Sequence, residues 1–206
     1  MTSSTPGRRP YAARMAPAER REQLLDAVLR VVAEQGVHKV SIDVVAREAG
    51  VTRPVVYAHF ADSNALLRAS LDREEQGALE QMARVLPDGR EESFAESAVA
   101  TFGRYLDAVL EEPERWRAIF MIADSSTPAF RARLDRGRRG VVTTLETALE
   151  TALDAAGTAT DVPVLARLLV AVAVESGRTV LTEPEDFPPA RLRAFAEQQL
   201  RRLLAV

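Results

Sequence analysis

The chain contains no cysteine, and this absence excludes a disulfide framework, a thiolate-ligated zinc site and a cysteine nucleophile. It has only two histidines, His38 and His59, which are widely separated, and it has neither a glycine-rich phosphate loop nor a His/Glu spacing typical of metal sites. We therefore expect no catalytic constellation, no metal and no cofactor, and predict that the protein is not an enzyme.

Long apolar runs are absent as well. No segment approaches the roughly 20 apolar residues that a membrane-spanning helix needs, and the arginine-containing first 20 residues include no hydrophobic stretch of the kind found in secretory signals. These observations predict a soluble cytoplasmic protein without a membrane partner.

The composition is otherwise that of a globular protein, with 206 residues, 47% apolar and 28% charged. The net charge of −3 hides an asymmetry, because residues 1–60 carry nine Lys/Arg against six Asp/Glu, whereas residues 61–206 carry eighteen against twenty-four. A basic excess confined to one end favours a polyanionic partner for that end. The alternative is a disordered, solubilising tail.

Apolar residues recur at helical spacing along most of the chain, and no stretch alternates with the period of two that a half-buried strand requires. The fold class is therefore predicted to be all-α, with about nine or ten helices. Residues 1–17 lack this periodicity and are rich in Ser, Thr, Pro and Arg, which predicts a flexible basic arm containing Arg8, Arg9 and Arg14. Gly137 and Gly140 are expected to interrupt the helix that begins near residue 128.

Residues 42–60 have the pattern that a helix-turn-helix demands. A small residue, Ala46, stands where the first helix would cross the second, and Gly50 follows where the turn needs a left-handed backbone. The second helix begins with polar or small residues, and Val56 and Phe60 provide its apolar face. The alternative is an unrelated hairpin of two helices around a glycine.

The same stretch resembles the DNA-binding domain of the tetracycline-repressor (TetR) family. The resemblance is carried by Ser41–Ile42, Ala46, Ala49–Thr52, Val56–Tyr57, His59–Phe60 and Leu66–Leu67, and it covers about a quarter of the chain, roughly residues 18–70. It implies an N-terminal three-helix DNA-binding domain at 18–70 and a larger helical effector-binding and dimerisation domain at 71–206. The family usually has a lysine three residues after the His-Phe pair, and this chain has Ser63 instead, so we expect a shallower salt dependence of DNA binding.

In such a domain the N-terminal residues of the second helix lie in the major groove of double-stranded DNA. Thr52 and Arg53 are then expected to contact base edges, Val55 a thymine methyl, and Tyr57 and His59 the phosphates. Alternative roles are a core aromatic for Tyr57 and a helix-end packing residue for His59. The full set of predicted DNA-contacting residues is Ser41, Arg47, Thr52, Arg53, Pro54, Val55, Tyr57, His59 and Ser63.

Two apolar stripes near the carboxyl end, at about 162–182 and 190–205, are suited to pair with a second copy in a four-helix bundle, as in the resembled family. The alternative is that both stripes are intramolecular core. Aromatic residues gather between residues 94 and 130, and the resemblance implies that this region encloses an apolar small molecule. The residues predicted to line that pocket are Met82, Phe102, Tyr105, Trp116, Phe120, Met121, Glu175 and Arg178.

Each of those aromatic residues could instead simply pack in the core. Glu175 and Arg178 could instead form an ordinary ion pair with each other. Gly77 is expected to be a bend point inside a long helix. The adjacent acids Glu74-Glu75 and Glu111-Glu112 are expected to be solvated, because neighbouring residues point to different sides of a helix.

Together these features predict a sequence-specific DNA-binding transcriptional regulator, most simply a homodimeric repressor that binds a palindromic operator and is released by a small-molecule effector. The alternative function is a helical small-molecule carrier, or an enzyme, without DNA binding. Neither the effector, the operator nor the choice between repression and activation follows from these residues.

Overall fold

The computed structural model describes residues 15–85, 93–123, 128–155 and 160–203, which contain helices and no strand. The arm residues Arg8, Arg9 and Arg14 lie outside the described residues. Nine α-helices and one 3-10 turn occur in the described part, which confirms the predicted all-α class. The helices are α1 (Pro17–Gln35), α2 (Ile42–Glu48), α3 (Arg53–Tyr57), α4 (Ser63–Val85), α5 (Phe94–Glu111), α6 (Pro113–Ala123), α7 (Pro128–Ala155), α8 (Val162–Thr182) and α9 (Pro189–Leu203).

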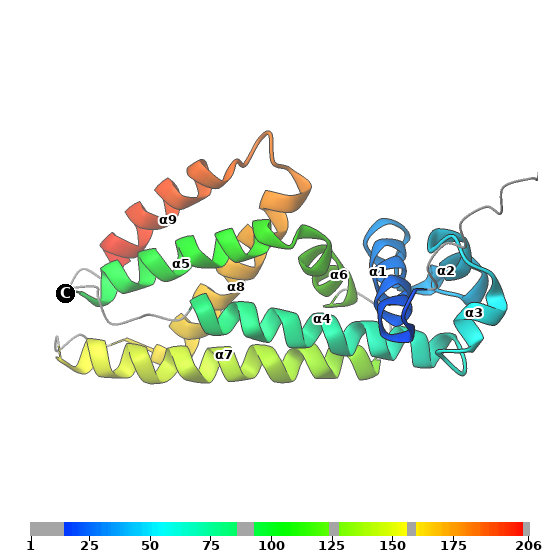
Figure 1. Cartoon of the computed structure of the whole chain (residues 1–206). Helices are drawn as coiled ribbons and strands as arrows, with labels where there is room; N and C mark the ends of the chain where they lie inside the picture. The colour runs from blue at the N-terminus through cyan, green and yellow to red at the C-terminus, as the bar shows by residue number, and fades with distance from the viewer. Residues whose placement is uncertain (1–14, 86–92, 124–127, 156–159, 204–206) are drawn as a thin grey trace, which may run out of the picture.

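The helices form two regions, which we call the head (α1–α3) and the body (α5–α9). The head lies at one end of an elongated molecule, and α4 runs from it into the body (Figure 1). In the body α5 packs against α9 on one side, while α7 packs against α8. The head is attached to the body mainly through α4 and α6, both of which contact α1, and Leu134 of α7 also packs against the apolar cluster of the head.

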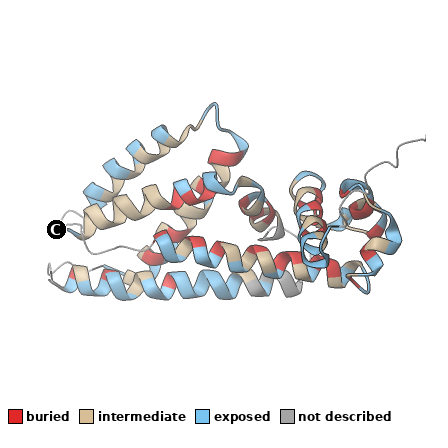
Figure 2. Cartoon of the chain, in the orientation of Figure 1, coloured by how far each residue is buried: buried red, intermediate tan, exposed pale blue. Residues whose placement is uncertain are grey.

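Buried residues follow the inner faces of these helices (Figure 2). One apolar cluster joins α1–α4, a second joins α4, α5, α6 and α8, and a third lies between α7 and α8. Helix α6 contributes Ala118 to the first cluster and Trp116 and Phe120 to the second. The short α6 is thus shared between the core of the head and the core of the body.

Helix α7 corrects one prediction, because it continues without interruption through Gly137 and Gly140. No atom lies within 4 Å of the position that a Cβ would take at either glycine, so neither residue is required by close packing. A glycine inside a helix costs about 1 kcal/mol relative to alanine. The burial of Val142, Leu149 and Leu153 along the same helix outweighs that cost.

Candidate nucleic-acid interface

The turn between α2 and α3 is fixed by short-range backbone chemistry. The hydroxyl of Ser41 accepts a hydrogen bond from the Val44 N–H at 3.3 Å and caps α2. Gly50 has a φ of 66°, in the left-handed region that favours glycine. The Val51 N–H then reaches back to the Ala46 carbonyl at 2.8 Å. The predicted small residue and glycine therefore stand where the turn needs them.

The second helix of the motif is held against the head by its apolar face. Val56 and Phe60 are buried in the cluster formed with α1. Helix α1 adds two polar supports: the Gln23 amide donates to the Ala49 carbonyl at 3.0 Å, and the Arg21 guanidinium lies 5.1 Å from the centroid of the Phe60 ring. With these contacts on one side, the opposite side of α3 is left to solvent.

The predicted DNA-contacting residues lie on that exposed side or at its edges. Tyr57 has 52% of its surface exposed, which excludes its alternative role as a core aromatic. Four of the predicted residues are half-buried, namely Ser41, Val55, His59 and Ser63, and five are exposed, namely Arg47, Thr52, Arg53, Pro54 and Tyr57.

One contact at this surface is absent from the sequence prediction. The Arg53 Nε lies 2.8 Å from a carboxylate oxygen of Asp43, in the first turn of α2. Both side chains are more than half exposed, so the ion pair is weak and readily exchanged for another partner. The pair thus links the first residue of α3 to the first turn of α2. The two residues are ten positions apart, and no local sequence pattern predicts that they pair.

The start of α4 follows directly. The carboxylate of Asp62 accepts a hydrogen bond from the Ala65 N–H at 2.7 Å and caps the helix. Ser63 is half-buried in the first turn, where the family usually has lysine. The capping carboxylate and the missing lysine both reduce the positive charge at this edge of the surface.

The helices predicted to pair with a second copy expose large apolar side chains. On α8 these are Val164, Leu168 and Val172, and on α9 they are Phe195 and Leu203. No described residue of α9 is fully buried. Beside this stripe, a surface hollow of about 350 Å³ is lined by Val172, Glu175, Ser176, Thr179, Glu183, Phe187 and Leu192.

Most of the residues predicted to bind an effector do gather in one place. Tyr105, Trp116 and Phe120 pack edge to face or tilted, with ring centroids 5.9 and 5.8 Å apart, and Met82 and Phe102 pack against the same cluster. The Tyr105 hydroxyl is buried and has no hydrogen-bond partner among the described residues. Burial also raises the pKa of the Tyr105 phenol, so the group is a neutral donor at neutral pH.

The other three predicted effector residues are Met121, Glu175 and Arg178, and of these Arg178 contacts one of the rings. The Met121 methyl is 3.9 Å from where a Cβ would lie on Gly36, which places it at the joint between α6 and the end of α1. Glu175 and Arg178 pair at 3.6 Å, as the alternative interpretation expects, and the Arg178 guanidinium also lies 5.7 Å from the Phe120 ring centroid. Of the predicted effector residues, only Glu175 lines the hollow beside the exposed stripe.

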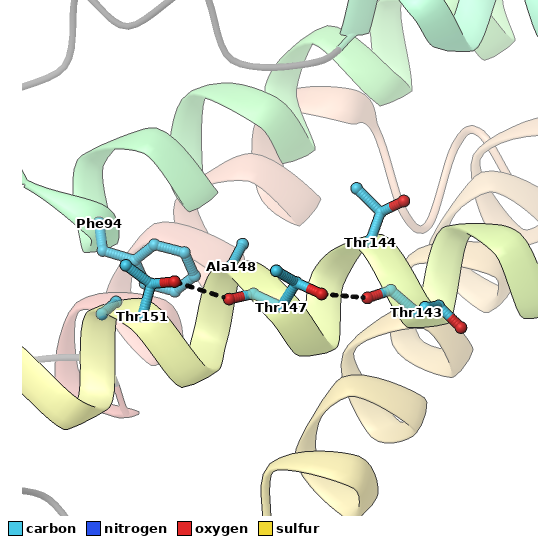
Figure 3. A pocket seen from close by; sticks show the side chains of 7 residues that line it. Phe94, Thr143, Thr144, Thr147, Ala148 and Thr151 are labelled. Carbon is cyan, nitrogen blue, oxygen red and sulfur yellow. Dashed lines mark hydrogen bonds between the residues drawn. The ribbon is translucent and has the colours of Figure 1, made fainter.

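A second and larger hollow, of about 620 Å³, follows one face of α7 beside Phe94 (Figure 3). The hydroxyls of Thr144, Thr147 and Thr151 donate to carbonyls one turn earlier in α7, at 3.0 to 3.2 Å. These hydrogen bonds occupy the hydroxyl protons within the helix. No predicted effector residue lines this hollow.

A buried polar cluster joins α4 to α6 and overturns the expectation that Glu74 is solvated. Glu74 is only 2% exposed, and its Oε2 accepts from the Arg115 Nε at 2.9 Å. Gln81, also buried, accepts from the Trp116 indole N–H and donates to the Ala108 carbonyl, both at 3.1 Å. The sequence does hold a signal for this cluster, because Glu74 and Gln81 fall in register with the buried Leu67, Leu71, Ala78 and Val85 of α4.

Gly77 of α4, the predicted bend point, lies beside the same cluster. A Cβ at Gly77 would stand 2.7 to 2.9 Å from atoms of the Arg115 guanidinium. The missing side chain therefore makes room for Arg115 to reach Glu74.

Two protein-family models match the two regions of this architecture. Residues 24–70 match the model of bacterial regulatory proteins of the tetR family, and residues 94–206, more than half of the chain, match the tetracyclin repressor-like C-terminal domain. The chain belongs to the TetR family. The predicted family, the helix-turn-helix and the helical C-terminal domain of this TetR-family protein are thereby confirmed.

Individual relatives agree with this assignment. The HTH-type transcriptional activator FasR of Mycolicibacterium smegmatis is 34% identical over 110 residues, which are 52% of this chain and 48% of FasR, so the TetR-family chain spans about half the length of that relative. A TetR-like transcriptional regulator from Rhodococcus sp. RHA1 superposes with a TM-score of 0.76 at 22% identity, covering 93% of this chain and 99% of that one.

A complex of SmeT with triclosan also has the same fold, with a TM-score of 0.65 at 23% identity over 89% of this chain and 90% of SmeT. SmeT is the repressor of a Stenotrophomonas maltophilia multidrug efflux pump.

The described residues also bear on metal sites and membrane spans. Over residues 15–85, 93–123, 128–155 and 160–203, no group of three or more His, Asp or Glu side chains is placed to hold a metal ion. Within the same part of the chain, no helix combines the length and apolar character needed to cross a bilayer.

Proposed function

We propose that the protein is a homodimeric transcriptional regulator that binds a palindromic operator through α3 and responds to a small-molecule effector. The observation that carries the proposal is the exposed amino end of α3, where Thr52 and Arg53 are presented by a helix-turn-helix whose opposite face is buried in the apolar cluster of the head. A helix offered in this way fits the major groove with its N-terminal residues at the base edges. The proposal assigns contacts with flanking phosphates to Tyr57, His59, Arg47 and Ser41.

The exposed faces of α8 and α9 support the dimer. A side chain such as Phe195, with 60% of its surface exposed, is stabilised when a partner covers it. Residues Val164, Leu168 and Val172 form one stripe on α8, at the spacing by which helices pack side by side. Two heads held by such an interface would contact two half-sites about one helical turn apart.

The aromatic cluster supports an effector that is largely apolar and carries a hydrogen-bond acceptor. The rings of Trp116 and Phe120 supply apolar surface, and the buried Tyr105 hydroxyl, which has no hydrogen-bond partner among the described residues, supplies a donor beside them. An acceptor on the effector would satisfy this hydroxyl, which costs free energy while it is buried without a partner. The binding of triclosan by SmeT, a protein of the same fold, agrees with an effector of this kind.

Selection of bound fragments from genomic DNA tests the proposal directly. The full chain is mixed with sheared DNA of its own source, and the recovered fragments are footprinted and measured at several salt concentrations. The proposal expects a protected palindrome, a stoichiometry of at least one dimer per site, and an affinity that falls as salt rises. The absence of retarded duplex at low ionic strength would overturn it and leave the small-molecule carrier as the better account.

The position of the operator decides between repression and activation. A repressor is expected where the site overlaps a promoter, and an activator where the site lies upstream of one. FasR is an activator and SmeT is a repressor, so proteins of this family act in both ways.

A further inference from the structure

Arg73 and Arg115 hold the buried carboxylate of Glu74 from two directions. The Glu74 Oε1 pairs with Arg73 at 2.7 Å, and the Glu74 Oε2 pairs with the Arg115 Nε at 2.9 Å. Arg73 belongs to α4 and Arg115 to α6. We call these three residues the clamp.

The clamp extends into the head through Arg73. The Nη1 of Arg73 also contacts two carboxylates of α1, Asp26 at 2.7 Å and Glu22 at 3.0 Å. One guanidinium is therefore shared between the buried Glu74 and the acidic face of α1. If Arg73 moves closer to Glu74, its contacts with the Asp26 and Glu22 carboxylates of α1 therefore weaken.

The clamp extends into the body through Arg115. Its Nη1 donates to the Gln81 Oε1 at 3.1 Å, and the same oxygen accepts from the Trp116 indole N–H at 3.1 Å. Trp116 stands edge to face with Tyr105 in the aromatic cluster. A continuous line of polar contacts thus runs from α1 of the head to the rings of the body.

A buried carboxylate makes this line sensitive to the position of α6. If α6 moves and Arg115 withdraws, Glu74 is left with one cation, and a buried charge without compensation is strongly unfavourable. Arg73 is then drawn toward Glu74 and away from Asp26 and Glu22. The contact between α4 and α1 weakens as a result.

We propose that the clamp of Glu74, Arg73 and Arg115 couples the aromatic cluster of the body to the orientation of the head on DNA. The inference rests on the proposed function and assigns the coupling to three residues of this chain that act by positioning α1, α4 and α6. Gly77 fits this arrangement, since a Cβ there would stand 2.7 to 2.9 Å from atoms of the Arg115 guanidinium, which would then have to shift. By reciprocity, DNA binding at the head must alter the surroundings of the rings.

Trp116 provides the measurement, because it is the single tryptophan of the chain and ends the line of contacts. The full-length protein is titrated with a labelled operator duplex recovered by the genomic selection. Anisotropy of the label reports binding, and tryptophan emission reports the state of the cluster. In the wild-type protein we expect the emission to change in proportion to the bound fraction.

Two variants break the clamp by different means. Glu74→Gln removes the central charge at nearly constant volume, and Gly77→Ala places a methyl group where the Arg115 guanidinium lies. For both we expect the operator affinity to stay within one order of magnitude while the emission change on binding falls to less than half. Glu146→Gln is the matched control, because it removes an interhelical pair with Arg167 at 3.1 Å between α7 and α8, away from the clamp.

Each outcome decides a separate question. If the wild-type protein binds no duplex, the proposed function fails and the coupling fails with it. If the wild-type protein binds but its emission does not change, or if both variants keep the full change, the clamp is refuted while DNA binding stands. If Glu74→Gln does not fold, Gly77→Ala decides alone, since alanine favours the helix.

Discussion

At the scale of one residue, the proposed DNA contact of Arg53 is preceded in the free protein by an ion pair with Asp43. Its guanidinium is held near the start of α3 by Asp43, in an ion pair exposed enough to be worth at most about 1 kcal/mol. A bidentate contact with guanine is worth about 1–3 kcal/mol of discrimination against the wrong base. The exchange of Asp43 for a base is therefore favourable, and the ordering of the side chain before binding reduces its entropic cost.

We predict that Arg53→Ala weakens binding to the selected operator by roughly 5- to 150-fold, which corresponds to about 1–3 kcal/mol. Binding to unrelated DNA should fall much less, because most of that affinity comes from phosphate contacts. Anisotropy titrations with both duplexes measure the ratio. Arg84→Ala, which removes an equally charged and exposed side chain at the far end of α4, is the control. Equal losses for both duplexes would assign Arg53 to phosphate contact instead.

For Ser63 we predict that a substitution by lysine increases the salt dependence of DNA binding. A lysine at this position would add one cation to the first turn of α4, beside the capping Asp62. The slope of log affinity against log salt should then steepen by about 0.9 if one more phosphate is neutralised. Ser63→Lys is compared with Ser63→Ala across a salt series, and the alanine variant should leave the slope unchanged. An unaltered slope for the lysine variant would place residue 63 away from the DNA backbone.

At the scale of elements, the features that could be predicted from the sequence are those set by residues close together in the chain. The helix-turn-helix could be predicted because Ala46, Gly50 and Val56 meet their structural demands within a dozen residues. The register of Glu74 with the buried residues of α4 indicates its burial, but its partner could not be predicted in the same way, since Arg115 lies 41 residues away on α6. The position of an effector pocket likewise depends on how α5, α6 and α8 are spaced, which local periodicity does not determine.

We predict that alanine substitutions at the glycines of α7 and α8 change the stability of the protein in opposite directions. Nothing lies near a Cβ at Gly137 or Gly140, so alanine at each position should stabilise the protein by about 0.4–1 kcal/mol. At Gly177 a Cβ would overlap the Tyr105 hydroxyl and stand 3.1 Å from the Phe120 Cζ, so alanine should destabilise by about 1–3 kcal/mol. Chemical denaturation of the three variants measures both effects.

Tyr105→Phe provides the control for this comparison. It removes the hydroxyl that the Gly177→Ala methyl would meet, so the double variant should be less destabilised than Gly177→Ala alone. If Gly177→Ala is as stable as Gly137→Ala, the close approach of α5 and α8 at this point is wrong.

At the scale of the whole molecule, the head is connected to the body mainly by α4 and α6 (Figure 1), and α8 and α9 of the body expose large apolar side chains. In the proposed dimer, a rearrangement of the aromatic cluster would reach DNA through α4 and α6, while the interface on α8 and α9 would set the distance between the two heads. The two functions are carried by different helices. A substitution on α8 should consequently separate the copies without disturbing the fold of the head.

We predict that Leu168→Glu converts the dimer to a monomer, because it places a charge in the centre of the α8 stripe, where Leu168 is 59% exposed in the single chain. Loss of the second head should lower the affinity for the palindrome by about 10²–10⁴, the gain that linking two binding modules supplies. The affinity for an isolated half-site should stay the same. Sedimentation equilibrium and duplex titrations measure the two effects. Leu79→Glu, at a leucine 53% exposed on α4, makes the same change outside the stripe and should remain dimeric. A Leu168→Glu protein that sediments as a dimer would move the interface away from α8.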